Sequence, residues 1–476
     1  MNNFKKLSTN AIIFAVVYTF CMYRNQASIM FPVMMAAGLW LIYSISDNRK
    51  PFDNKISGFY NVVIALISIS IFMTNDPKLI FMSKCIVLFL FICLCVEIFV
   101  DDSEWQDFHY IKGILKLCVS SIGNGLSYFS DGSKYRKEIK SDNPQETHKN
   151  ENLIKVVRGL IFTVPLLLII IPLMMSADVV FLNMIESVFD IDKINELLFE
   201  KINVVGLAFT IAISLLLFYG LQRFLIQSKN LVFTDREKNA DAVSAITVTG
   251  VIGFVYGVFS FIQIRGILFS NVKLPDGYTY ARYAREGFFQ LFVLALINMA
   301  IVLICASRYE YNRILKCILY AMCAFTYVMI FSSAYKMILY IEVYNLTFLR
   351  IMVLWSLAVV AVIMIAVVRY VYRNDFSLFK FAAVVVTSFY IIVAFGRPDY
   401  MVAKYNLEIG NTQHIGWSYI NRLSCDALPV VAKYNEEMYE NNSGRIFRNA
   451  KEDYEQMSFR TFNLSVYIAG QKMNLH

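Results

Sequence analysis

Residues 378–407, LFKFAAVVVTSFYIIVAFGRPDYMVAKYNL, change at Gly396 from a nearly unbroken apolar run to a polar segment. The apolar part, residues 378–396, has about the 20-residue length with which a helix crosses a bilayer. Pro398 suits the first turn of a second helix, where its missing backbone N–H costs nothing. The stretch therefore predicts a last membrane span that leads directly into a helical segment outside the membrane.

The whole chain has the composition of a protein that spans a membrane many times. Of its 476 residues, 58% are hydrophobic and 17% are charged, whereas soluble domains carry about 25% charged residues. Apolar stretches of spanning length occur at residues 8–23, 27–45, 56–73, 78–100, 156–182, 203–226, 243–270, 285–306, 313–339, 346–372 and 378–396. The predicted fold class is all-α: a polytopic helical membrane protein with about 11 transmembrane helices and a small C-terminal helical domain outside the membrane.

Basic residues are denser in every second connection between these stretches, although the leaner connections include a basic group around residues 273–285. The dense connections lie at residues 49–55, 112–158, 223–238, 308–316 and 369–380. Because Lys and Arg accumulate on the cytoplasmic side of a membrane protein, we expect the N-terminus inside and the C-terminus outside. The net charge of +8 is then explained by membrane topology, because the basic residues lie in the connections between apolar stretches. A nucleic-acid binder would instead gather them on one soluble face. No nucleic-acid partner is expected.

The pattern divides the chain into four predicted domains. Residues 1–100 hold the N-terminal four transmembrane helices, and residues 156–396 hold a seven-helix transmembrane core. Between them, residues 101–155 comprise a cytosolic amphipathic helix, apolar at three- and four-residue steps from Phe108 to Phe129, and a flexible linker from residue 131. Residues 397–476 form an extracytoplasmic helical domain, which with roughly 80 residues can hold only a small core.

Charged and polar residues in the outer halves of several spans form a candidate ligand pocket. Its members are Asp178, Arg265, Arg285, Glu286, Gln290 and Lys336. Charges at such depth are costly and mark functional sites by default, and the Arg guanidinium offers a bidentate fork for a phosphate or an anionic headgroup. In the alternative interpretation, Lys and Arg near span ends only reach outward to lipid phosphates.

Catalytic patterns are scarce in this sequence. It contains no phosphate-binding glycine loop, no His-Glu-x-x-His element and no nucleophile elbow. The four His all lie outside the candidate spans, and the Cys at 93 and 95 lack the spacing of a zinc pair. The first outer connection has no acidic residue and the second offers only Asp76. We therefore expect no catalytic residue, cofactor or metal site, and the sequence argues against an enzyme without excluding one.

Three short elements near the C-terminus stand out, and their residues are Pro398, Asp399, Tyr405, Asn406, Asp426, Pro429 and Asn463. With them the chain resembles the bacterial membrane proteins grouped as domain-of-unknown-function family 4173, which is related to family 4153. In that family an Asn-Pro-Asp or similar element leads into Tyr-Asn-Leu, followed by Leu-Ser-x-Asp-Ala-x-Pro and by Phe/Trp-Asn-Leu-Ser. The chain departs from the pattern at Arg397, and the resemblance implies a location in the bacterial cytoplasmic membrane but no activity.

These elements favour a structural role over a ligand site. Asp399 is expected to cap the helix that begins at Pro398, and Tyr405 and Asn406 to hold that helix by hydrogen bonds. For the whole protein, the leading hypothesis is the binding or movement of an anionic amphiphile or lipid-linked ligand through the outward-facing pocket. Its partners would be membrane lipids, among them an anionic lipid or lipid-phosphate. The alternatives are a non-enzymatic signalling or assembly scaffold with an envelope protein partner, and a lipid-dependent membrane enzyme.

Overall fold

The computed structural model describes residues 2–46, 50–100, 107–142, 204–228, 242–268, 280–309, 312–373, 376–409, 416–434 and 444–473. The regular elements in these ranges are helices. Eight of them, within the described ranges, are long and apolar enough to cross a membrane, which confirms an all-α multi-pass membrane protein. The 16-residue α2 is shorter than these, and the expected span at 156–182 lies outside the described residues.

One group of helices packs around a first apolar core. Its members are α1 (Asn2–Met22), α2 (Met30–Ile45), α3 (Lys55–Met73), α4 (Pro77–Phe99), α5 (Asp107–Gly125), α10 (Val204–Gln227) and α15 (Leu378–Gly396). Leu41, Ile64 and Leu90 are fully buried in it. The rings of Phe14 on α1 and Phe218 on α10 stack 4.0 Å apart, so this core draws on both sides of the domain boundary expected near residue 156.

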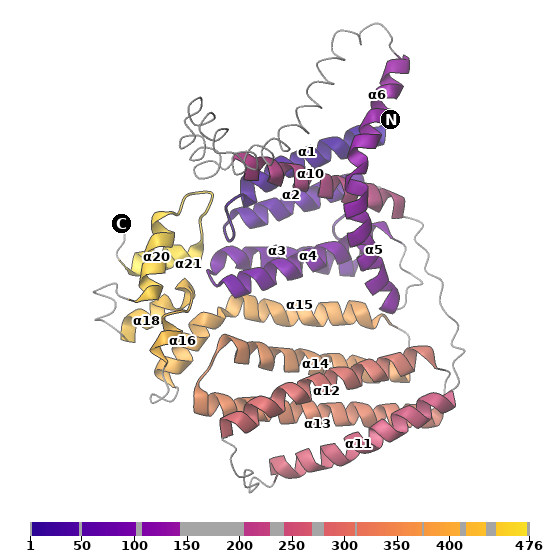
Figure 1. Ribbon diagram of the computed structural model, residues 1–476, viewed down its shortest axis with the longest axis vertical. Helices are drawn as coiled ribbons and strands as arrows, with labels where there is room; N and C mark the ends of the chain where they lie inside the picture. The colour runs from indigo at the N-terminus through magenta and orange to yellow at the C-terminus, as the bar shows by residue number, and fades with distance from the viewer. Residues whose placement is uncertain are drawn as a thin grey trace, which may run out of the picture.

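A second core joins α11 (Ala242–Leu268), α12 (Tyr280–Arg308), α13 (Arg313–Tyr344) and α14 (Phe348–Tyr372). Asn298 on α12 ties this group together, because its Nδ2 donates to the carbonyl of Met322, 2.9 Å away, and to Oγ1 of Thr326 at 2.6 Å, both on α13. The two groups meet where Trp355 of α14 packs edge-on against Tyr390 of α15. Apart from α5, the helices of both groups run side by side across Figure 1.

Side chains at the helix starts fix where several spans begin. Asn54 accepts from the backbone N–H of Ile56, and Asp76 accepts from that of Lys78, 3.0 Å away. Asn312 and Ser377 do the same for α13 and α15. Such caps accept hydrogen bonds from the backbone N–H groups that have no partner in the first turn of a helix. Each of these spans can therefore begin directly after a short polar connection.

Helix α5 crosses the spans at the end opposite the C-terminus (Figure 1). Its residues Ile111, Leu115, Val119 and Ile122 are 49–69% exposed, which is typical of an apolar face turned toward lipid. The following α6 (Ser127–Asp142) is a helix, so the linker expected from residue 131 is wrong over residues 131–142. Oδ2 of Asp131 on α6 lies 3.2 Å from Nε of Arg223 and accepts from the hydroxyl of Tyr219 at 2.9 Å, both on α10. These tertiary contacts support a helix in a segment whose sequence shows no apolar periodicity.

The last elements form a small unit with its own core, at the end of the spans opposite α5 (Figure 1). They are α16 (Pro398–Glu408), α17 (Trp417–Ile420), η4 (Cys425–Ala427), α18 (Leu428–Tyr434), α20 (Arg445–Glu455) and α21 (Leu464–Lys472). Val402, Leu428 and Phe447 are fully buried there. We call α16 to α21 the terminal unit. Arg397, in the left-handed region at φ 49°, makes the sharp turn between α15 and α16.

Candidate functional site

The residues of the expected pocket come from neighbouring helices, as far as the structure describes them. Arg265 on α11 and Gln290 on α12 are exposed, and Lys336 on α13 is half-buried. Arg285 and Glu286 lie on α12 at positions whose side chains are not described, and Asp178 lies outside the described residues. The side chains of three of the six members are therefore placed.

A hydrogen bond sets the relative height of the two described cations. Ser332 of α13 donates to Oε1 of Gln263 on α11 across 2.7 Å. Arg265 follows Gln263 by two residues and Lys336 follows Ser332 by four, and both helices run toward the same end. At a rise of about 1.5 Å per residue, the two cations start roughly 3 and 6 Å beyond this bond. We call Gln263, Arg265, Ser332 and Lys336 the outer band.

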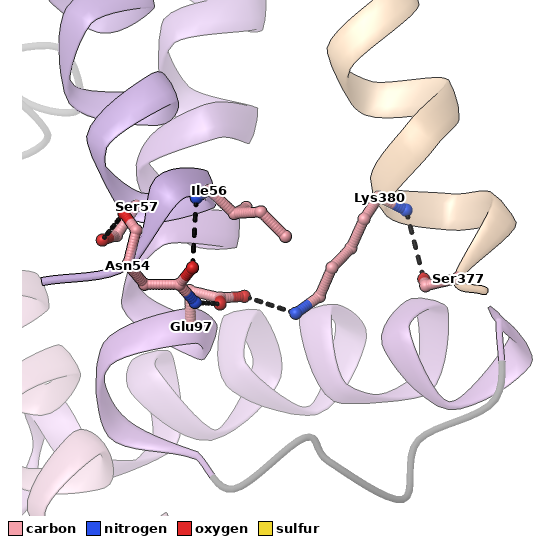
Figure 2. Close-up of polar contacts among 6 residues, drawn as sticks. All are labelled: Asn54, Ile56, Ser57, Glu97, Ser377 and Lys380. Atoms are coloured by element: carbon pink, nitrogen blue, oxygen red, sulfur yellow. Dashed lines mark hydrogen bonds and ion pairs between the residues drawn. The ribbon is translucent and has the colours of Figure 1, made fainter. Parts of the chain in front are cut away.

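A buried ion pair lies at the other end of the spans. Oε2 of Glu97, at the end of α4, is 2.8 Å from Nζ of Lys380, at the start of α15. Asn54 donates its Nδ2 to Oε1 of the same carboxylate at 2.5 Å, so Glu97 lies between Asn54 and Lys380 (Figure 2). The Lys380 ammonium also lies 5.5 Å from the ring centre of Tyr110 on α5. The pair thus joins α3, α4, α5 and α15.

The space beside this ion pair is too small for an organic ligand. Tyr60, Cys93, Glu97, Tyr110 and Lys380 are among the residues that line a cavity of about 10 Å³, which is roughly the volume that a single water needs. The geometry therefore supports a structural joint here rather than a substrate site. The sequence carried a signal for it, since Glu97 is an acidic residue within a predicted span, where charges are rare.

Removing one charge of the joint should destabilise the protein. Lys380→Met removes the cation that lies 2.8 Å from Glu97, whose side chain is 6% exposed, and we expect the free energy of unfolding to fall by about 3 kcal/mol. The double variant Glu97→Gln/Lys380→Met should recover most of the lost free energy of unfolding, because it removes the buried carboxylate charge together with its cation. Thermal unfolding of the purified protein measures both. Lys112→Met, an exposed lysine on α5, is the matched control, and an equal loss in that variant would contradict the prediction.

The family-like residues of the terminal unit meet the connection between α3 and α4. Asp426 accepts from Thr74 Oγ1 at 2.5 Å, from the backbone N–H of Asn75 at 3.3 Å, and from the hydroxyl of Ser465. Asn463 donates its Nδ2 to the carbonyls of Ala27 and Thr74, 3.0 and 2.9 Å away. Both side chains are almost fully buried. Residues some 350 positions apart in the chain are therefore joined by a dense set of hydrogen bonds.

A second contact of the terminal unit lies on the connection between α13 and α14. Asn406 pairs with the backbone of Leu346 through both its amide groups: its Oδ1 accepts at 2.8 Å and its Nδ2 donates at 2.9 Å. This agrees with the hydrogen-bonding role expected for that residue. Tyr405 lies partly buried beside the cluster of Met337 and Ile341. Pro398 and Pro429 both stand in first helical turns, of α16 and α18.

Asp399 does not cap α16, contrary to expectation. The N-cap position belongs to Arg397, which makes no side-chain cap, and Oδ2 of Asp399 instead accepts from the backbone N–H of Ser424 at 2.8 Å. The reason is positional, because a residue after Pro398 already lies inside the first turn. Asp399 thereby joins α16 to the segment that carries Asp426.

Three carboxylates gather where the terminal unit meets the spans. Asp76, Asp399 and Asp426 are 1%, 3% and 2% exposed. Burial and the nearby charge of Asp399 raise the pKa of the Asp76 carboxyl to about 6. Burial also raises the pKa of Asp426, although Ser465 and Thr74 donate to it and act in the opposite direction. Sequence reasoning noted Asp76 only as an acid in an outer connection, and nothing local could reveal its distant neighbours.

Comparison with known proteins identifies a family but no characterised relative. A family model described as "Domain of unknown function (DUF4153)" matches residues 33–434. This range contains the outer band, the ion pair and the three carboxylates, but it stops before Asn463 and Ser465. No curated protein and no solved structure matches significantly.

Proposed function

The chain belongs to the family described as domain of unknown function (DUF4153), and from this premise we propose that it binds or moves an anionic amphiphile at the outer band. That it is an integral, multi-pass membrane protein follows from its helices. The family supplies no substrate, so the proposal rests on the residues of the outer band. Its ligand class is an anionic lipid or lipid-phosphate.

The observation that carries the proposal is the bond between Gln263 and Ser332. It brings Arg265 and Lys336 to similar heights on adjacent helices, although each cation alone has the simpler explanation of reaching out to lipid phosphates. Two cations at similar heights on adjacent helices can instead bind the same headgroup, with Arg as the bidentate donor and Lys as a point charge.

The surroundings of the outer band are suited to an acyl chain. Helix α11 is exposed over most of its surface, with Phe254 at 74%, Phe261 at 67% and Val251 at 65%. Apolar side chains this exposed within a span face hydrocarbon. An amphiphile bound at the outer band could therefore leave its chains along α11 while its headgroup meets Arg265. Because the site opens to lipid, it needs no enclosed cavity.

We also propose an orientation for the chain. The connection between α3 and α4 lies at the terminal unit, where Thr74 bonds Asp426, and the end of α4 and the start of α15 lie at the opposite end, where Glu97 pairs with Lys380. The connections rich in Lys and Arg fall at the Glu97 end, which therefore faces the cytoplasm. The terminal unit and the outer band then lie outside the cytoplasmic membrane of a bacterium, with the N-terminus inside.

The proposal predicts a specific lipid that copurifies with the protein. Native mass spectrometry of the full chain in membrane-derived nanodiscs should show one anionic amphiphile retained by the wild type. Arg265→Ala/Lys336→Ala should reduce its occupancy at least about tenfold, since two charge-assisted contacts to the headgroup are lost. The matched control is Arg308→Ala/Arg313→Ala. It removes two cations beside the connection between α12 and α13, at the end of α13 away from the outer band.

Each result decides between the proposal and its alternatives. Equal loss in both double variants would indicate general attraction of anionic lipid and contradict a site at the outer band. If the wild type carries only bulk lipid, the proposal fails. A protein that remains bound in place of a lipid would favour the scaffold, while an acidic residue needed for turnover but not for binding would favour a lipid-dependent enzyme.

A further inference from the structure

The connection between α20 and α21 is a tight turn with an exposed phenylalanine at its tip. The backbone N–H of Thr461 donates to the carbonyl of Ser458 at 3.1 Å, and the N–H of Ser458 donates to Oγ1 of Thr461 at 2.8 Å. A turn closed in this way places its two central residues, Phe459 and Arg460, at the tip. Phe459 is 82% exposed, more than any other large hydrophobic residue in the described ranges.

Arg460 attaches this turn to the last turn of α1. Its Nη1 donates to the backbone carbonyls of Phe20 and Tyr23, 3.1 and 2.7 Å away. Its own carbonyl accepts from Nδ2 of Asn25 at 3.0 Å. The last carbonyls of a helix have no partner within the helix, so a basic side chain that binds them caps its end. The tip of the turn is therefore fixed at the end of α1.

The next residues hold the turn against the ends of two more helices. The carbonyl of Phe462 accepts from the backbone N–H of Ile29 at 3.0 Å, directly before α2. Nδ2 of Asn463 donates to the carbonyl of Thr74 at 2.9 Å. Thr74 ends α3, which is one of the helices long and apolar enough to cross a membrane. The turn thus lies at the level where the spans end, on the side of the terminal unit.

One face of α1 beside this turn is apolar and exposed. Ile12, Val16 and Phe20 follow one another at four-residue steps and are 46%, 58% and 61% exposed. Helix α1 packs along α10, which is one of the spans. An apolar row this exposed on a helix packed among spans faces hydrocarbon. Because Arg460 binds the carbonyl of Phe20, the neighbouring Phe459 lies close to the end of that row.

We propose that Phe459 inserts into the lipid leaflet on the side of the terminal unit and anchors this unit to the membrane surface. Aromatic side chains collect at membrane–water interfaces. Arg24 is exposed just after the end of α1, and an arginine at this level reaches lipid phosphates. The contact depends neither on the outer band nor on its ligand, and the family model, which ends at residue 434, does not include it.

Photo-cross-linking of the full-length protein in nanodiscs tests the insertion. The photoreactive amino acid p-benzoylphenylalanine replaces Phe459, and the nanodiscs contain phosphatidylethanolamine and phosphatidylglycerol. Irradiation should attach a lipid at this position, which peptide mass spectrometry detects. The matched control carries the same amino acid in place of Lys451, which pairs with Glu455 on the exposed, charged face of α20. It should give no lipid adduct, because that face meets water.

A second measurement compares the reactivity of two introduced thiols in the same nanodiscs. A membrane-impermeant maleimide should react with Phe459→Cys at least about tenfold more slowly than with Lys451→Cys, because the thiolate is the reactive form and apolar surroundings disfavour it. In denaturant the two variants should react alike. The proposal is overturned if they react alike in nanodiscs as well. It is overturned equally if p-benzoylphenylalanine at position 459 attaches no lipid, whether it attaches to a second copy of the chain or to nothing.

Discussion

Replacing Asp426 by alanine is expected to release the terminal unit from the spans and to lower the free energy of unfolding by about 3–5 kcal/mol. The carboxylate is 2% exposed and accepts from three donors. Without it, the hydroxyls of Thr74 and Ser465 and the N–H of Asn75 lose their acceptor in a place that water does not reach. A buried donor left unsatisfied costs about 1–3 kcal/mol, so the three losses outweigh any gain from removing the charge.

Hydrogen exchange and thermal unfolding of the purified Asp426→Ala protein would measure this effect. Amides of α16 and α21 should lose protection, whereas those of α12 and α13 should keep it, because the second core does not contact Asp426. Asp453→Ala is the matched control: it removes a carboxylate from the same junction that bonds Asn75 from an exposed position, and exposed contacts contribute less than about 1 kcal/mol. Equal losses in the two variants would show that the buried network does not hold the unit in place.

The spans could be predicted from the sequence because hydropathy reports the solvent that a segment meets. Stretches such as 56–73 and 378–396 reappear as α3 and α15 nearly residue for residue. Hydropathy does not report which segments become neighbours. The placement of α10 beside α1, the pairing of Glu97 with Lys380, and the bond from Thr74 to Asp426 all depend on tertiary structure, and no local pattern contains them.

The terminal unit shows the same division between local and tertiary information. Pro398 marked the start of a helix correctly, because its preference acts within one turn. Asp399 was assigned a local role and instead bonds the backbone of Ser424, 25 residues away. Of the outer band, Arg265 and Lys336 were predicted from charge and depth alone, whereas Gln263 and Ser332 were not predicted. Its cations lie on adjacent helices, and what they bind stays a prediction.

Three contacts along α15 show how the two ends of the protein are connected. Lys380 holds its N-terminal end to Glu97. In its C-terminal half, the hydroxyl of Tyr390 pairs with that of Ser83 at 2.8 Å and donates to the carbonyl of Leu79. Beyond Arg397 the chain continues at once into α16. Because α4 and α15 are bonded at both ends, a displacement of the terminal unit would be transmitted along a stiff pair of helices.

Substituting valine for Gly220 is expected to separate α5 from α10 and to destabilise the protein by at least about 3 kcal/mol, since overpacking is most costly against backbone that cannot rotate away. A Cβ at Gly220 would overlap the carbonyl oxygen of Ser121 and lie 2.9 Å from Cα of Gly125. The contact between α5 and α10 is also close at Gly125 of α5, where a Cβ would lie 2.8 Å from the carbonyl oxygen of Leu216 on α10. Small residues permit such approaches between helices in membranes.

Gly123→Val is the matched control for this crossing. Gly123 lies on α5 two residues from both Ser121 and Gly125, yet a Cβ there would meet nothing within 4 Å, so this variant should be as stable as the wild type or slightly more stable. Hydrogen exchange across α5 should rise steeply in Gly220→Val and stay unchanged in Gly123→Val, because exchange reports local opening. Similar behaviour of the two variants would mean that α5 is held by its apolar face in the lipid and not by α10, and the exposed residues Leu115 and Val119 would then be the positions to substitute next.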